Sequence, residues 1–326
     1  MEAAQNGSTP ATIEPPEAFC SRHPNLQQVQ IHVHTVHYVA SASFQQCPNL
    51  EQVEFVATTG GESRISSSSS AAAGAALIPK LTMIRDDAFR QCHNLHSVIG
   101  MEHLCDSLER IGHFTFLECG KLTTLDFSHL TRLQYLGEKA FIDCKSLTVV
   151  DLSNSLLLET IRESTFFFCK ALKILYLPPK LKRIQRGAFF GCSALVKIGI
   201  PAMVEFLGYQ AFYDCSSLTT ITFHSTSHLR RLMNHHQPDN IFGKQPFDEC
   251  TSLHSLELPG PPIPRELWPL LLEQFLQDSN GILAQMGILG KQRITIAWNF
   301  VRANIANFYV DKKKPEYCRK RDINGN

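Results

Sequence analysis

Apolar residues recur along most of the chain in one fixed order, which can be written L-x-x-I-x-x-x-A-F-x-x-C-x-x-L-x-x-I-x-I. Residues 181–200, LKRIQRGAFFGCSALVKIGI, match this order at every marked position. The order is neither helical throughout nor strictly alternating. Its last segment, L-x-x-I-x-I, predicts a short strand. The neighbour of that strand is the same segment one repeat away, which predicts a parallel sheet with strands about 4.8 Å apart.

Eight copies of this repeat carry a phenylalanine followed three residues later by a cysteine. A single copy cannot enclose its own apolar side chains, whereas stacked copies align them into one interior ladder. The cysteines from Cys92 to Cys215 are 27, 25, 25, 23 and 23 residues apart, a near-fixed period that is typical of solenoids. The first copy is Phe44 and Cys47, and the seven that follow supply the predicted structural ladder: Phe89, Cys92, Phe116, Cys119, Phe141, Cys144, Phe166, Cys169, Phe189, Cys192, Phe212, Cys215, Phe247 and Cys250.

The repeats divide the chain into four predicted parts. We expect a disordered N-terminal arm at 1–17, a solenoid of about nine units at 18–258, a helical C-terminal cap at 259–310 and a basic tail at 311–326. The ninth unit is a degenerate copy at the start, with Cys20 in the phenylalanine slot and His23 in the cysteine slot. Polar insertions at 60–76 and 233–243 explain the two wide gaps between cysteines and are expected to be loops. In the cap, one apolar helix stripe is formed by Ile294, Trp298, Val301, Ile305 and Phe308.

These residues resemble the BspA-like leucine-rich repeat family, whose signature is an AFxxC core flanked by leucine and isoleucine at this period. The resemblance covers about residues 18–258. It implies a leucine-rich-repeat solenoid with a parallel sheet on one face, usually taken to bind other proteins or surface ligands. Many relatives are secreted or anchored at the cell surface.

Composition and charge narrow the expected location and partners. Lysine and arginine number 31 against 30 acidic residues, so no bulk electrostatic field recruits nucleic acid or an anionic membrane. The basic cluster at 312–321 is a local exception to this charge balance. It has three interpretations, a nuclear-import signal, a nucleic-acid contact or, as is commoner for a charged terminus, a solvated tail. The first residues lack the features of a secretory signal, and no apolar run approaches the length of a membrane span. We therefore expect an intracellular protein, cytoplasmic or nuclear, whose eleven cysteines are mostly reduced thiols.

The repeated cysteine has three interpretations. The favoured one is packing, in which the cysteine points inward as a small apolar side chain and its S–H donates weakly to a neighbouring carbonyl. A disulfide between adjacent copies is opposed by the parallel direction of equivalent side chains, and a metal site lacks any close C-x-x-C spacing. The segment IHVHTVH places His32 and His34 on one face of a strand, where a solvated face is favoured over a metal site. No metal and no cofactor is expected.

The chain carries no familiar catalytic motif. The patterns G-x-S-x-G, G-x-x-x-x-G-K, G-x-G-x-x-G and H-E-x-x-H are all absent from the sequence. We therefore predict that the protein is not an enzyme, and that it is a non-catalytic scaffold or interaction module. The alternative is a secreted or surface adhesin-like protein.

The strand segment also predicts which residues a partner would contact. Its leucine and the residues three and five later face the core, so the residues two and four later face outward. In the middle of the stack this rule exposes apolar and aromatic side chains beside carboxylates, the mixture expected of a protein-binding hot spot. β-branched and aromatic residues also suit any strand, so strand propensity alone explains them equally well. The predicted partner-binding residues are Asp126, Val149, Asp151, Ile174 and Tyr176.

Overall fold

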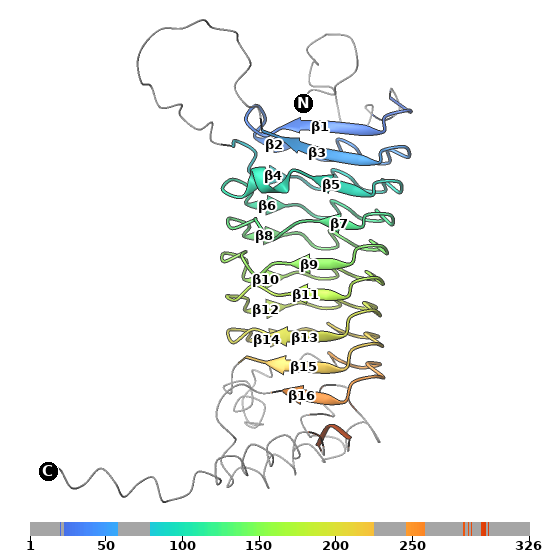
Figure 1. Cartoon of the computed structure of the whole chain (residues 1–326), viewed down its shortest axis with the longest axis vertical. Helices are drawn as coiled ribbons and strands as arrows, with labels where there is room; N and C mark the ends of the chain where they lie inside the picture. The colour runs from blue at the N-terminus through green and yellow to red at the C-terminus, as the bar shows by residue number, and fades with distance from the viewer. Residues whose placement is uncertain are drawn as a thin grey trace, which may run out of the picture.

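The computed structural model describes residues 20, 23–57, 79–224, 246–257, 283, 286, 288, 295–297 and 299. These residues form a parallel β-solenoid, in which successive repeats are stacked from β1 at one end to β16 at the other (Figure 1). Within the described residues, nine front strands follow the predicted L-x-x-I-x-I segments. They are β1 (Gln28–His32), β3 (Gln52–Val56), β5 (Ser97–Ile99), β7 (Thr124–Leu125), β9 (Val149–Asp151), β11 (Ile174–Tyr176), β13 (Lys197–Ile200), β15 (Thr220–Phe223) and β16 (Ser255–Glu257).

A second ladder of short strands runs beside the front strands and was not predicted. Each short strand has two residues, of which the second is buried, and each pairs in parallel with the equivalent strand of a neighbouring repeat. Seven repeats in the described part of the chain carry both a short and a front strand. The short strands are β2 (Tyr38–Val39), β4 (Met83–Ile84), β6 (Arg110–Ile111), β8 (Tyr135–Leu136), β10 (Thr160–Ile161), β12 (Arg183–Ile184) and β14 (Phe206–Leu207). A 3-10 helix, η2 (Met101–Leu104), fills the longer connection from β5 to β6.

The phenylalanines and cysteines form the interior ladder that the sequence predicts. The rings from Phe44 to Phe247 stack one on the next, with centroids 5.1–5.4 Å apart. Each ladder cysteine from Cys92 to Cys250 is buried, and its Sγ donates to the carbonyl oxygen of the phenylalanine in the preceding repeat at 2.9–3.4 Å. The favoured interpretation of the cysteines, packing with a weak S–H donor, is therefore confirmed for these seven. Cys105, outside the ladder, is half-buried.

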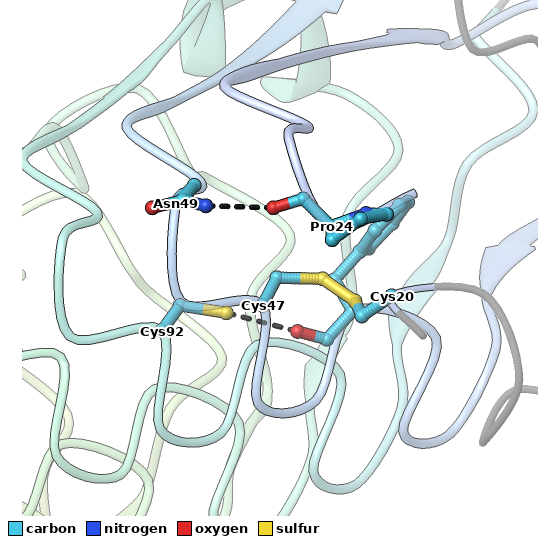
Figure 2. Close-up of a disulfide and its surroundings, with 6 residues drawn as sticks. Cys20, Pro24, Cys47, Asn49 and Cys92 are labelled. Carbon is cyan, nitrogen blue, oxygen red and sulfur yellow. Dashed lines mark hydrogen bonds between the residues drawn. A yellow bond between two sulfur atoms is a disulfide. The ribbon is translucent and has the colours of Figure 1, made fainter. Parts of the chain in front are cut away.

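The expectation of packed thiols is wrong for one pair at the N-terminal end. Cys20 and Cys47 form a disulfide, with their Cα atoms 5.3 Å apart (Figure 2). The ladder explains why they meet. In the later repeats, the cysteine sulfur hydrogen-bonds to the phenylalanine of the preceding repeat. In the first, degenerate repeat, Cys20 stands at the position of that phenylalanine. A sulfur in the slot therefore comes within bonding distance of the next sulfur. Seven of the other described cysteines are free thiols, and the eighth, Cys250, has its Sγ hydrogen-bonded to the Phe212 carbonyl at 3.1 Å.

Two smaller predictions are also wrong. β1 ends at His32, so His34 lies in the following turn and the two histidines do not share a strand face. The outward rule fails at Thr220, which is buried in the central strand of the β13-β15-β16 sheet.

Several predicted segments lie outside the described residues. These are the arm at 1–17, the insertions at 60–76 and 233–243, the tail at 311–326 and most of the cap at 259–310. The apolar stripe from Ile294 to Phe308 is among them, so the helical cap stays a prediction. The described residues of this region do contact the last repeat. The backbone N–H of Phe247 donates to the Met286 carbonyl at 2.9 Å. In the preceding repeats, the equivalent phenylalanine N–H donates to a carbonyl of the next repeat, so Met286 takes the place of a next repeat here. Ile296 is buried.

Candidate functional site

Four of the five predicted partner-binding residues lie on two neighbouring front strands, and Asp126 directly follows the next front strand, β7. β9 and β11 pair in parallel, with Val149 opposite Ile174 and Asp151 opposite Tyr176. Val149, Ile174 and Tyr176 are 41%, 43% and 56% exposed, whereas the inward residues Val150 and Leu175 are buried. We call Val149, Ile174 and Tyr176 the front patch.

The front patch lies in the middle of the stack, between two larger sheets. The pair β9-β11 separates the four-stranded sheet β1-β3-β5-β7 from the three-stranded sheet β13-β15-β16 (Figure 1). The front positions that flank it along the stack are polar and exposed, Thr124 on one side and Lys197 on the other. Val196, beside Lys197, is a further exposed apolar residue that the sequence analysis missed. The outward rule selects only the residues two and four after the leucine, and Val196 directly follows Leu195.

Asp126 and Asp151 lie at the edge of the front patch, and both also stabilise the local backbone. The Asp126 Oδ1 accepts hydrogen bonds from the Ser128 backbone N–H at 2.8 Å and from the Ser128 hydroxyl at 2.6 Å. The Asp151 Oδ1 accepts the Ser153 N–H at 2.9 Å. Both carboxylates thereby stabilise the turn that follows their strand, as aspartates commonly do. Asp126 is exposed and its Oδ2 lies 3.5 Å from the His129 Nε2, whereas Asp151 is half-buried and its Oδ2 accepts no hydrogen bond from the described residues.

The interior cysteines are poor candidates for chemistry. Burial raises the pKa of the Cys92 thiol to about 12, and burial likewise raises the pKa of Cys119, Cys144, Cys169, Cys192 and Cys215. Since the thiolate is the nucleophile and the metal ligand, these groups are held in an inert form. In the described part of the chain, no three His, Cys, Asp or Glu side chains gather where they could hold a metal ion. None of the helices described is long and apolar enough to cross a membrane.

Solved structures with a similar repeat come from several bacteria. A leucine-rich repeat protein from Bacteroides ovatus is 22% identical over 71% of this chain and 55% of its own, with a TM-score of 0.44. The leucine-rich repeat protein of T. pallidum is 20% identical over 70% of this chain and 78% of its own, with a TM-score of 0.40. The pneumococcal vaccine antigen PcpA is 15% identical over 72% of this chain and 57% of its own, with a TM-score of 0.32.

The chain thus spans about half the length of the B. ovatus protein. No protein of curated function matches the sequence. The family match is broader than these structural likenesses. The BspA type leucine rich repeat region matches in overlapping stretches at residues 12–127, 73–192, 109–231 and 159–261, which together include the whole described solenoid up to β16. The AFxxC repeat and the match across these residues lead to one conclusion: the chain belongs to the BspA-type leucine-rich repeat family.

Proposed function

We propose that this protein is a non-catalytic interaction module that binds a partner protein through the front patch and its two flanking aspartates. One observation carries the proposal: three large apolar side chains in register on β9 and β11 remain exposed. The repeat fold suits this role, since stacked repeats create extended surfaces that do not depend on loops.

The size and chemistry of the front patch support a binding role. Burying a large apolar side chain stabilises a complex by about 1.5–3 kcal/mol relative to leaving it in water. Tyrosine is enriched among the residues that dominate binding energy, and it carries a hydroxyl that can bond at the edge of a dry contact. Asp126 and Asp151 supply a charged rim, which favours a partner with lysine or arginine around an apolar centre.

The test compares partner binding by two triple variants of the full chain. In the first, Val149, Ile174 and Tyr176 are replaced by alanine. In the second, a matched control, the exposed residues Leu156, Leu157 and Met203 in the connections after β9 and β13 are replaced by alanine. Partners that co-purify from native cells are quantified by mass spectrometry, and the affinity of the strongest one is then measured with purified proteins.

We expect the front-patch variant to lose its partner and the control to keep it. Tyr176→Ala alone should weaken the purified complex by about 2 kcal/mol, the size of a typical hot spot, without changing the unfolding midpoint. Identical partner profiles for the first variant and the unaltered protein would show that the patch reflects strand propensity and that binding, if any, uses another surface.

The second candidate is an adhesin-like protein that acts outside the cell. The Cys20–Cys47 disulfide favours it, because disulfides persist in oxidising compartments and are rare in the cytosol. The intracellular location expected from the sequence stays a prediction. Peptide mapping of the protein taken from native cells, with free thiols blocked at lysis, tests both: a reduced Cys20 in a cytosolic fraction removes this candidate, and an oxidised pair in an extracellular fraction supports it.

A further inference from the structure

A second surface of the solenoid carries a regular array that the front patch does not use. Each short strand presents one residue outward, and these residues are in register from repeat to repeat: Tyr38 pairs with Met83, Met83 with Arg110, and Arg110 with Tyr135. Further along, Thr160 pairs with Arg183, and Arg183 with Phe206. Arginine and aromatic side chains therefore share one column.

The guanidinium groups in and beside this column lie over the aromatic rings. Arg85 lies 3.8 Å from the centroid of the Tyr38 ring, and Arg183 lies 4.8 Å from that of Phe206. The Tyr135 ring has Arg110 at 3.8 Å and Arg162 at 4.2 Å. Since one ring face has no room for two guanidinium groups at these distances, the two lie on opposite faces. We call these four arginines and three aromatic residues the arginine–aromatic stripe.

The arginines of the stripe have no acidic partner among the described residues. Their side chains form no ion pair and no hydrogen bond there, whereas other cations of the same ladder are paired. Glu109 accepts from Arg132 at 2.9 Å and from Gln134 at 3.1 Å, and Glu159 accepts from Lys182 at 2.8 Å. The nearby carboxylates of Glu109 and Glu159 are thus engaged elsewhere.

Stacking on a ring occupies a face of the guanidinium and leaves its edge free. The five N–H donors of arginine lie in the plane of the group, in a fork that matches a carboxylate. The rings hold that fork in one orientation, so less side-chain freedom is lost when an anion binds. Arg85 and Arg183 are exposed, and Arg110 and Arg162 are half-buried.

A shallow groove lies along the stripe. It has a volume of about 390 Å³ and is lined by Thr82, Met83, Glu109, Arg110, Gln134 and Tyr135. The Thr82 hydroxyl donates to the His37 carbonyl at 3.3 Å and can still accept a hydrogen bond. The Gln134 amide donates one N–H to Glu109 and keeps its oxygen and second N–H for a peptide backbone, and Met83 offers a flexible apolar contact. The groove therefore offers a peptide the Arg110 guanidinium and the remaining hydrogen-bonding groups of Thr82 and Gln134, beside a Glu109 carboxylate that Arg132 and Gln134 already engage.

We infer that the arginine–aromatic stripe binds an extended acidic peptide segment of a partner protein, through charge-assisted hydrogen bonds from the stacked arginines to its carboxylates. A uniformly anionic polymer such as nucleic acid fits less well. Glu109, Glu138, Glu159 and Glu163 lie within three residues of Arg110, Tyr135 or Arg162 in the chain and repel continuous negative charge. A peptide can place its carboxylates at intervals and present neutral groups between them.

The test uses a fluorescent peptide of alternating glutamate and glycine, whose carboxylates all lie on one side when the peptide is extended. Its affinity for the full chain is measured by fluorescence anisotropy. Two comparison probes are the peptide with glutamine in place of glutamate and a single-stranded oligonucleotide of equal charge. We expect saturable binding of the glutamate peptide, at least about tenfold weaker binding of the glutamine peptide, and loss of affinity as salt is raised.

Variants locate the binding. The double variant Arg110→Gln and Arg162→Gln keeps hydrogen-bond donors but loses both charges, and it should bind the glutamate peptide about tenfold more weakly or worse. Arg90→Gln is the matched control, because Arg90 is already paired with Asp87 at 3.1 Å. Arg85→Gln, at an exposed position, replaces the double variant if the latter does not fold. Tyr176→Ala should leave this affinity unchanged, which separates the stripe from the proposed front patch.

Three outcomes overturn the inference. One is the absence of saturable binding of the glutamate peptide. Another is equal affinity for the arginine variants and the Arg90→Gln control. The third is tighter binding of the oligonucleotide than of the peptide, which would assign the stripe to nucleic acid.

Discussion

At the scale of single residues, the interior cysteine joins two repeats through a weak hydrogen bond and stays protonated. The Cys144 Sγ donates to the Phe116 carbonyl at 3.2 Å, and both residues are fully buried. A thiolate in this position would lose its hydration, and for this reason burial raises the pKa. The same burial that packs the ladder therefore links its stability to pH.

We expect the folded state to lose stability as the pH rises from 9 to about 12. The pKa of Cys92 is raised from its ordinary value of 9.0 to about 12 on folding. Between these values the unfolded thiol loses its proton and the folded one keeps it, so the unfolded state binds fewer protons and the free energy of unfolding falls with pH. Below pH 9 both states are protonated and this contribution to the pH dependence vanishes.

The urea unfolding midpoint, measured at pH 8.0, 9.5 and 10.5, checks this expectation. Tyrosine and lysine also titrate in this range, so the control is Cys144→Ala, which removes one raised thiol. Its midpoint should be lower at pH 8.0 and should decline less steeply with pH. Parallel declines for the two proteins would show that the buried thiols are not responsible.

At the scale of one element, the turn around each core phenylalanine needs two residues in the left-handed region. In six complete turns, the residues two before and two after the phenylalanine have positive φ without being glycine, as Lys139 (φ 59) and Asp143 (φ 59) do around Phe141. Around Phe189 both positions are glycine, Gly187 and Gly191. Interior contacts hold the turn in this conformation, since the core phenylalanine and the alanine that precedes it in several repeats are both buried.

Gly187→Ala should lower the free energy of unfolding by about 1 kcal/mol, because a side chain in the left-handed region costs roughly that much. Space is not the cause, since an added Cβ would meet Ser164 Oγ at 3.5 Å and Phe167 Cδ2 at 3.6 Å, ordinary contacts. Gly120→Ala is the control. Its φ lies outside the left-handed region and its Cβ would meet only Asp143 O at 3.8 Å, so we expect a change within about 0.5 kcal/mol. Chemical denaturation measures the free energy of unfolding of both variants. An equal loss for Gly187→Ala and Gly120→Ala would show that the left-handed conformation of Gly187 is not the cause.

The elements that could be predicted from the sequence are those defined by apolar spacing. Phe141 and Cys144 are interior residues because their spacing recurs, and Tyr176 is exposed because strand residues alternate. The two-residue short strands have too little sequence to alternate and are held by hydrogen bonds between backbones. The left-handed turn residues are mostly not glycine, so composition does not mark them. The arginine–aromatic stripe joins residues such as Tyr38 and Arg85, which are separated in the chain by an insertion and meet only after the repeats stack.

At the scale of the whole molecule, the repeats form a one-dimensional stack in which each contacts its neighbours. The Phe141 ring lies between those of Phe116 and Phe166, at 5.2 Å from each. Stability in such a stack is approximately a sum of repeat and neighbour terms. One consequence is that the interior repeats should be interchangeable where they share ladder residues.

We therefore expect the protein to fold after deletion of residues 145–169, the 25 residues from the position after Cys144 to Cys169. Cys144 is then followed by Lys170, Ala171 and Leu172, which preserves the spacing from cysteine to leucine. Phe141 can stack on Phe189, and the remaining strands pair as before in a rod about 5 Å shorter. The shortened protein should keep a strand-rich circular dichroism spectrum and unfold cooperatively at a lower urea concentration.

Deletion of residues 157–169 is the control, because it removes half a period and joins Leu156 to Lys170. The interior residues of the joined repeat then no longer align with those of their neighbours. A folded half-period variant, or a full-period variant that fails to fold, would show that the solenoid depends on contacts beyond adjacent repeats.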